Sequence, residues 1–205
     1  MSKNYQTIET SLNKEVVGIT LPTAFEVYTK HLFGEERYNI FCKGLQQSSS
    51  VSIRLNPFKT SETTQVADNL VPTHVAWCAE GFYLNSRPNF TFDPLFHAGA
   101  YYVQEASSMF LSHVLRHLVR KPVALLDLCA APGGKTTCAR TAIKEGSIVF
   151  SNEPINKRAQ ILAENVQKFG HSDVVVTNNY PRDYKKTKLS FDVIVADVPC
   201  SGEGM

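Results

Sequence analysis

Two short segments of the chain combine residues that could do chemistry. The first, Cys129-Ala-Ala-Pro-Gly-Gly-Lys135, joins a short apolar run to a helical pattern. Gly133 and Gly134 let the backbone approach a ligand closely, and the N-terminus of the following helix offers unpaired N–H groups to an anion. The second, Asp197-Val-Pro-Cys-Ser-Gly202, follows another apolar run and places a cysteine near an aspartate. Both segments are therefore candidate ligand-binding loops.

A phosphate-binding P-loop is the main alternative for the first segment. Its pattern, G-x-x-x-x-G-K-[ST], is matched at its end by Gly134, Lys135 and Thr136. The opening glycine would fall at position 129, which is Cys129, and Pro132 removes one of the N–H groups that should surround a phosphate. The loop therefore favours another nucleotide-like ligand.

A carboxylate follows the next apolar run, which ends in Asn152 and Glu153. A carboxylate at the end of a second parallel strand can accept hydrogen bonds from both ribose hydroxyls of an adenosine ligand. The alternative is a solvent-facing acid that the helix dipole favours in a first helical turn. Given the glycine loop before it, we favour the ribose contact for Glu153.

The cysteine of the second segment suits a carbon acceptor. Enzymes that methylate amines place an Asn or Asp, two prolines and an aromatic residue at this point, whereas this chain has Asp197, Pro199 and Cys200. A thiolate added to carbon 6 of cytosine makes carbon 5 electron-rich enough to attack a sulfonium methyl group. Asp197 could hold the base edge and help to place a proton on the ring nitrogen. The alternative for Cys200 is a small buried hydrophobic residue.

The elements that must position these loops follow a regular order. Apolar runs at 123–128, 147–151, 173–177 and 191–196 alternate with helical patterns, one at about 135–144 and one with Pro154 at its first position and Gly170 at its end. This order predicts parallel strands with right-handed crossovers. The fold class is therefore α/β: part of a doubly wound, Rossmann-type domain, C-terminally incomplete, over residues 122–205.

Residues 1–121 are less regular and predict a small α+β lead-in region. Helical patterns cover Pro22–His31, Glu35–Gln46 and Gln104–Arg120, and an alternating stretch, Val51–Leu55, predicts a strand.

The overall composition excludes several classes of protein. A hydrophobic share of 43% with 20% charged residues is ordinary for a globular protein, and a net charge of +2 gives no argument for nucleic acid by itself. The absence of a long apolar run and of a signal-type start predicts a cytoplasmic protein without a membrane span. Five scattered cysteines indicate reduced thiols and no zinc, and His113 and His117 lack an acidic partner, so we expect no metal.

The two loops together resemble those of the Nop/Sun family of RNA cytosine-5 methyltransferases. The resemblance extends upstream: 52–57 is similar to the family's Arg-x-Asn segment near its RNA-binding region, 99–109 to the lead-in to its catalytic domain, and 77–83 to its bacterial ribosomal-RNA branch. It thus implies that residues 122–205 form part of an S-adenosylmethionine-dependent methyltransferase domain and that residues 1–121 are its RNA-binding lead-in region. The implied partner is RNA, ribosomal RNA first and transfer RNA second.

This resemblance also implies roles for residues. Cys129, Ala130, Ala131, Pro132, Gly133, Gly134, Lys135, Glu153 and Asp197 would bind S-adenosylmethionine, and Cys200 would assist release of the methylated base. The adenine contact after the third strand is left open between Asn178 and Asn179. The covalent nucleophile would lie in a Thr-Cys motif after a fifth strand, beyond position 205. A fragment that binds RNA or cofactor without turnover, and a nucleotide hydrolase, are the alternatives.

Overall fold

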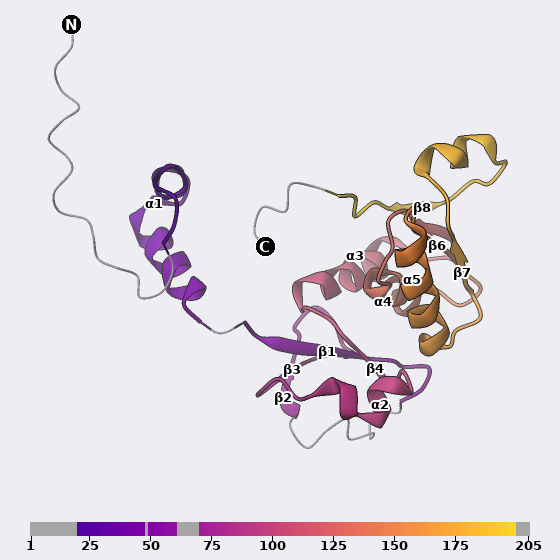
Figure 1. The fold of residues 1–205 in the computed structure, drawn as a ribbon, viewed down its shortest axis with the longest axis horizontal. Helices are drawn as coiled ribbons and strands as arrows, with labels where there is room; N and C mark the ends of the chain where they lie inside the picture. The colour runs from indigo at the N-terminus through magenta and orange to yellow at the C-terminus, as the bar shows by residue number, and fades with distance from the viewer. Residues whose placement is uncertain (1–19, 48, 61–69, 200–205) are drawn as a thin grey trace, which may run out of the picture. The chain divides into compact units, whose positions relative to one another are not determined.

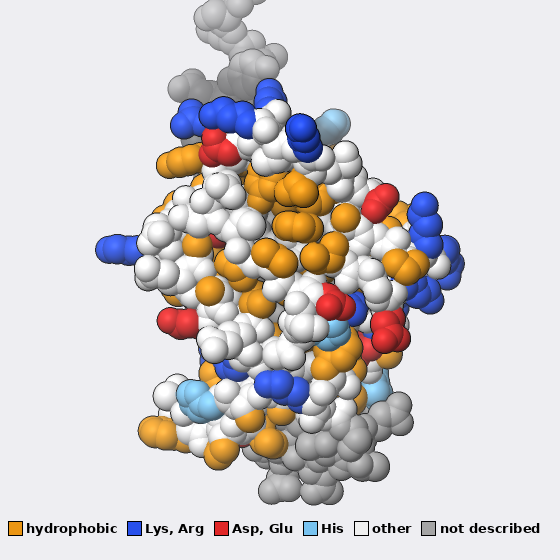
Figure 2. All heavy atoms as spheres, turned by 90° about the vertical axis from the view of Figure 1, so that its right-hand side faces the viewer, with side chains coloured by type: hydrophobic (Ala, Val, Ile, Leu, Met, Phe, Trp, Pro, Cys, Tyr) orange, Lys and Arg blue, Asp and Glu red, His pale blue; other side chains and the backbone are white. Residues whose placement is uncertain are grey.

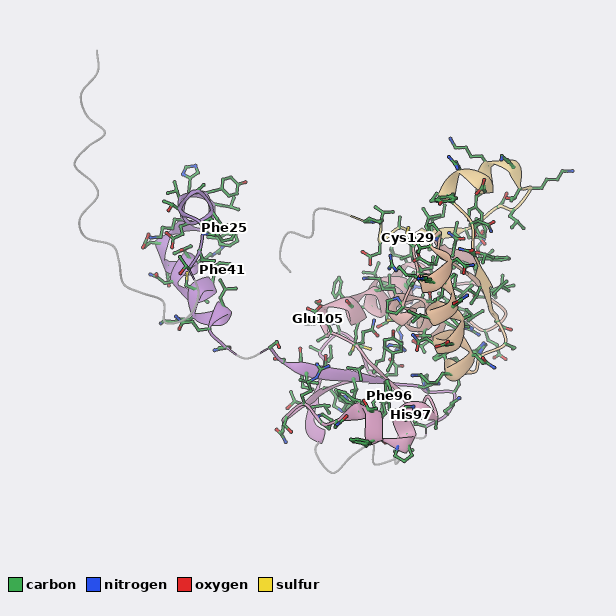
Figure 3. All side chains as sticks on the ribbon, in the orientation of Figure 1. Phe25, Phe41, Phe96, His97, Glu105 and Cys129 are labelled. Atoms are coloured by element: carbon green, nitrogen blue, oxygen red, sulfur yellow. The ribbon has the colours of Figure 1, made fainter. Side chains whose placement is uncertain are left out.

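The computed structural model describes residues 20–47, 49–60 and 70–199, and the chain divides into two compact units, Met1–Ser49 and Ser50–Met205. The first unit contains α1 (Thr23–Leu45), which is interrupted at Gly34, where φ is 75°. Its two halves agree with the two helices expected here. Phe25 and Phe41, one from each half, have ring centroids 6.1 Å apart (Figure 3). The predicted division near residue 121 stays a prediction.

The second unit begins with an antiparallel sheet (Figure 1). Its strands have the order β2-β3-β1-β4. The strands are β1 (Val51–Leu55), β2 (Leu70–His74), β3 (Gly81–Leu84) and β4 (Tyr101–Val103). The short helices η1 (Phe90–Phe92) and α2 (Pro94–His97) precede β4, and η2 (Ser107–Met109) and α3 (Phe110–Leu118) follow it. The strand predicted at Val51–Leu55 is confirmed as β1.

A four-stranded parallel sheet follows, with the order β7-β6-β5-β8. Its strands are β5 (Ala124–Asp127), β6 (Ile148–Asn152), β7 (Val174–Thr177) and β8 (Val193–Val195). The helices α4 (Gly134–Ala142) and α5 (Asn156–Phe169) connect the first three strands, and η3 (Pro181–Lys186) precedes the fourth. The predicted Rossmann-type parallel arrangement is therefore confirmed.

The parallel sheet is buried because apolar side chains of its strands pack against apolar side chains of the neighbouring helices. Leu125 of β5 and Val149 of β6 are fully buried in a core that includes Leu115 of α3 and Ala139 of α4. Leu162 and Val166 of α5 pack in another cluster with Val174 and Val176 of β7. Burial of a large aliphatic side chain contributes about 1.5–3 kcal/mol, so the apolar runs that predicted these strands also hold the sheet between its helices.

Two predicted helix starts are wrong. The helix expected from Gln104 begins only at Phe110, after η2, because the backbone of Gln104 is extended against β1 and donates its N–H to Ser52 O at 3.2 Å. The helix expected to begin at Pro154 begins at Asn156, because Ile155 is the N-cap and still has extended backbone, with φ −89° and ψ 115°. In both cases the helical pattern in the sequence begins before the backbone becomes helical.

The strand β8 lies at one edge of the parallel sheet, and its Ile194 side chain is 59% exposed. The face drawn in Figure 2 carries hydrophobic side chains at its centre, with Lys and Arg side chains toward the rim. Among the described helices, none is long and apolar enough to cross a membrane.

Gly99, in the turn between α2 and β4, provides a test of how closely this turn approaches α5. Its φ is +71°, and a Cβ at this position would lie 2.0 Å from the carbonyl oxygen of Lys168. Gly99→Ala should therefore lower the free energy of unfolding by about 3 kcal/mol, from positive φ and steric overlap together. Gly146→Ala, with φ +81° but its nearest contact at 3.6 Å, should lose only about 1 kcal/mol. Urea unfolding of both variants measures the difference, and equal losses would contradict this packing.

Candidate functional site

The loop after β5 is held in a fixed shape at the carboxyl end of the parallel sheet. Ala130 donates its N–H to Asn152 O at 2.8 Å, and Gly133 donates to Ala130 O at 2.8 Å. Gly133 has φ +110°, and a Cβ there would lie 3.1 Å from Leu162 Cδ1. A residue with a side chain would strain this turn, so the glycine is needed both for its conformation and for its contact with α5.

An open cavity of about 210 Å³ lies between this loop and the segment after β4. Figure 3 labels Glu105 from that segment and Cys129 from the loop. The cavity is lined by six of the predicted donor-loop residues and by Asp197, together with five residues of the β4 region. These are Cys129, Ala130, Ala131, Pro132, Gly134, Lys135, Asp197, Tyr102, Val103, Gln104, Glu105 and Ser108. The glycine loop and Asp197, the first residue of the second loop, therefore meet at one cavity.

An ion pair joins the two loops across this cavity. Lys135 Nζ donates to Asp197 Oδ2 at 2.5 Å, and the two side chains are 36% and 57% exposed. Exposed pairs of this kind contribute about 0–1 kcal/mol. The pair can therefore open at low energetic cost to let either group contact a ligand.

Glu153 lies just beyond the end of β6 and is 1% exposed. Its Oε1 accepts a hydrogen bond from the Ile155 N–H at 3.1 Å. Its Oε2 has no hydrogen-bond partner in the described part of the chain, and Arg158 Nη2 is 3.7 Å away. The alternative of a solvent-facing acid is thus wrong. A buried carboxylate oxygen without a donor fits a ligand that supplies hydroxyl groups.

Asp127, the last residue of β5, is a buried carboxylate that the sequence reasoning did not select. Its Oδ2 accepts a hydrogen bond from Thr136 Oγ1 at 2.7 Å, while its Oδ1 has no partner within the described residues. Burial raises the pKa of Asp127 to about 6, against the opposing effects of the Thr136 hydroxyl and the Lys135 charge. An acidic residue that directly ends a buried apolar strand is the signal that could have identified it.

The cysteines differ in their placement. Cys129 borders the cavity, whereas Cys138 is fully buried in α4, and burial raises the thiol pKa of both. A raised pKa leaves less thiolate, so neither has the environment of an activated nucleophile. Cys200 lies outside the described residues, and its role stays a prediction.

Asn178 and Asn179, the candidates for the adenine contact, both bond within the protein. The Asn178 side chain donates to Glu153 O at 2.6 Å and to Pro154 O at 3.1 Å. The Asn179 N–H donates to Asn152 Oδ1 at 3.1 Å. Both residues thus fix the loops around Glu153, and the choice between them as adenine contact stays a prediction.

Comparison with known families gives two matches along the chain. Residues 21–106 match the N-terminal domain of 16S rRNA methyltransferase RsmF, and residues 118–205 match 16S rRNA methyltransferase RsmB/F. The "Ribosomal RNA small subunit methyltransferase F" of Pectobacterium atrosepticum is 34% identical over 178 residues, which cover 80% of this chain and 36% of that protein. Its counterpart in Psychromonas ingrahamii is 34% identical over 195 residues, which cover 90% and 40%. The chain thus spans about two fifths of the length of these curated relatives.

Solved structures show the same fold. A methyltransferase homologue from Pyrococcus horikoshii has a TM-score of 0.76 at 26% identity, with 90% of this chain and 61% of that chain covered. The structure of NSun6 from Pyrococcus horikoshii with SFG has a TM-score of 0.71 at 16% identity, and the match covers 87% of this chain and 71% of that chain. The second likeness is one of fold alone.

The raised pKa of Asp127 predicts a pH dependence of stability. Because the folded-state pKa is about 6 against an ordinary 3.8, the fold favours the protonated acid. The contribution of the protonated Asp127 to the free energy of unfolding is fully present below about pH 4. This contribution, about 3 kcal/mol, is lost as the pH rises through 6. When the pH is raised from 4 to 7, the free energy of unfolding of Asp127→Asn should therefore fall less than that of the parent chain. Urea unfolding at the two pH values measures this.

The exposed Glu164 on α5 offers a matched control for this measurement. Glu164→Gln should follow the parent curve. Parallel curves for Asp127→Asn and the parent would show that Asp127 does not titrate in this range.

Proposed function

Because the chain belongs to the 16S rRNA methyltransferase RsmB/F family, we propose that it forms the S-adenosylmethionine site of an enzyme that methylates carbon 5 of cytosine in ribosomal RNA. The observation that carries the proposal is the cavity in which the glycine loop meets Asp197, with buried Glu153 at the end of the neighbouring strand. 16S rRNA as the substrate, which the descriptions of the two matching families name, is part of this proposal, and so is a cytoplasmic location.

In the proposed complex the adenosine ribose lies at Glu153. The unpartnered Oε2 would accept a hydrogen bond from a ribose hydroxyl, which would satisfy a buried group whose desolvation otherwise costs about 1–3 kcal/mol. The loop from Cys129 to Lys135 would surround the remainder of the cofactor. Arg158 Nη2 also donates to Ala131 O at 2.9 Å, which ties α5 to this loop beside Glu153.

The target base would lie on the cavity side of the loop. Asp197 borders the cavity and is exposed, so its carboxylate could accept a hydrogen bond from the exocyclic amine of cytosine. Lys135 would then have to release it. The bound cofactor supplies the methyl group, and we assign to Cys200 a part in releasing the methylated base. The covalent nucleophile would be the cysteine of the Thr-Cys motif that the resemblance places after a fifth strand.

The ribose assignment can be tested with Glu153→Gln. Replacing the carboxylate by an amide weakens a charge-assisted hydrogen bond, so affinity for S-adenosylmethionine should fall about 10- to 100-fold by calorimetry. Glu164→Gln, on the exposed side of α5, should bind like the parent. A parent chain that prefers ATP to S-adenosylmethionine would instead support the nucleotide hydrolase.

The release role can be tested by Cys200→Ala in an active protein that contains this chain. Methyl transfer to 16S rRNA should nearly cease, and a covalent RNA–protein adduct should accumulate on denaturing gels, because elimination of the product lacks its assisting group. Clean turnover without an adduct would contradict this role. Cofactor and RNA binding without turnover in every form of the protein would favour the binding-only alternative.

A further inference from the structure

Arg54 of β1 is a buried charge with an unusual set of partners. It is 1% exposed and makes no ion pair within the described residues. Its Nε donates to Gln104 Oε1 at 2.8 Å and its Nη2 to Thr137 Oγ1 at 2.6 Å. It also lies 3.4 Å from Gly134 O. The guanidinium thus connects the antiparallel sheet to the first turn of α4.

This contact determines which way the Gln104 amide faces. A guanidinium can only donate, so the oxygen of the amide must face Arg54 and its NH₂ group must face the other side. The backbone of Gln104 is fixed as well, because Ser52 Oγ donates to Gln104 O at 2.6 Å. The backbone of Gln104 is therefore held in place, and its side-chain oxygen and nitrogen cannot exchange positions.

The NH₂ group of Gln104 lies beside the glycine loop. Gln104 is 7% exposed and lines the cavity, and its Nε2 is 3.5 Å from the place that a Cβ of Gly134 would occupy. Within the described residues this nitrogen donates no hydrogen bond, since the polar contacts of the Gln104 side chain end at Arg54. A nearly buried amide with two donors directed at a cavity is suited to an acceptor oxygen.

We propose that Arg54 is a positioning residue that fixes the Gln104 amide, and that Gln104 Nε2 donates to a carboxylate or carbonyl oxygen of the ligand in this cavity. The inference rests on the proposed function and deepens it. Two sources have this chemistry: the carboxylate of the amino-acid part of S-adenosylmethionine and the ring carbonyl of a pyrimidine. The N-terminus of α4 beside Gln104 favours the charged oxygen of the carboxylate.

The variant Gln104→Glu separates binding from folding. It has the same shape, and one of its oxygens can still accept from Arg54, so the fold is retained. The other oxygen replaces the NH₂ group and repels an acceptor. Affinity for S-adenosylhomocysteine should fall at least about tenfold by calorimetry, while affinity for 5′-methylthioadenosine, which lacks the carboxylate, should not change. Gln167→Glu on the exposed side of α5 is the matched control and should bind both like the parent.

The outcomes distinguish the sources. If Gln104→Glu loses affinity for S-adenosylhomocysteine alone, the acceptor of the Gln104 hydrogen bond is the carboxylate of the cofactor. Unchanged cofactor binding with at least about tenfold weaker binding of a cytosine-containing RNA assigns the pyrimidine carbonyl. A folded Gln104→Glu protein that binds both ligands like the parent overturns the inference and leaves the proposed function intact. A parent chain that binds neither cofactor analogue overturns both.

Arg54→Lys tests the positioning role separately. A lysine keeps the charge but cannot donate to Gln104 and Thr137 as a planar fork. S-adenosylhomocysteine affinity, or RNA affinity if that is the ligand, should fall in Arg54→Lys, yet fall little further when Arg54→Lys is added to Gln104→Glu. Additive effects in the double variant would mean that Arg54 only supports the fold. Thermal unfolding of each variant confirms that the compared proteins are folded.

Discussion

Two buried side chains, Thr136 and Asn152, hold the carboxyl ends of the parallel strands together through their hydrogen bonds. The geometry of the cavity depends on these hydrogen bonds. Thr136 donates its hydroxyl to Asp127 Oδ2 and accepts from Ser151 Oγ, both at 2.7 Å, which pins the start of α4 to the ends of β5 and β6. With the aspartate ionised, one proton per hydroxyl allows only this direction. The glycine loop cannot move away from the sheet without breaking a buried network.

Asn152 performs the same task for the next two loops. Its Nδ2 donates to Leu128 O and Asn179 O, and its Oδ1 accepts from Thr177 Oγ1 and the Asn179 N–H. One fully buried amide therefore links the segments after β5, β6 and β7. Glu153 directly follows Asn152, so its backbone is held in place by the same hydrogen bonds. A carboxylate kept buried with one oxygen unpartnered is costly, and the surrounding hydrogen bonds are what prevent it from rotating out to water.

The sequence was sufficient for features that local patterns encode. Apolar runs such as that ending at Asp127 predicted the parallel strands, and Gly133 and Gly134 predicted the turn, because burial and positive φ leave a signature in residue type. It was insufficient where the environment comes from distant segments. Gln104 fits a helical pattern but is held extended by Ser52, and the burial of Asp127 depends on Thr136 from α4. Nor could periodicity indicate that Glu153 is buried.

The strand β1 shows this difference most clearly. Its apolar residues Ile53 and Leu55 pack in the core of the antiparallel sheet, and an alternating strand with polar residues between them ordinarily has a solvated second face. Here Ser52, Arg54 and Asn56 are all at most 4% exposed. Segment 52–57, which the resemblance placed near an RNA-binding region, therefore turns its polar face inward.

The polar face of β1 forms hydrogen bonds to α4 and to the end of α5. Arg54 reaches the first turn of α4, while Asn56 Nδ2 donates to Gly99 O at 2.9 Å and to Phe169 O, at the end of α5, at 2.8 Å. Apolar packing would allow the antiparallel sheet to slide against these helices, whereas hydrogen bonds fix distance and direction. Since β4 and the residues after it form one wall of the cavity and the loop before α4 forms the other, the polar face of β1 sets the separation between the two walls.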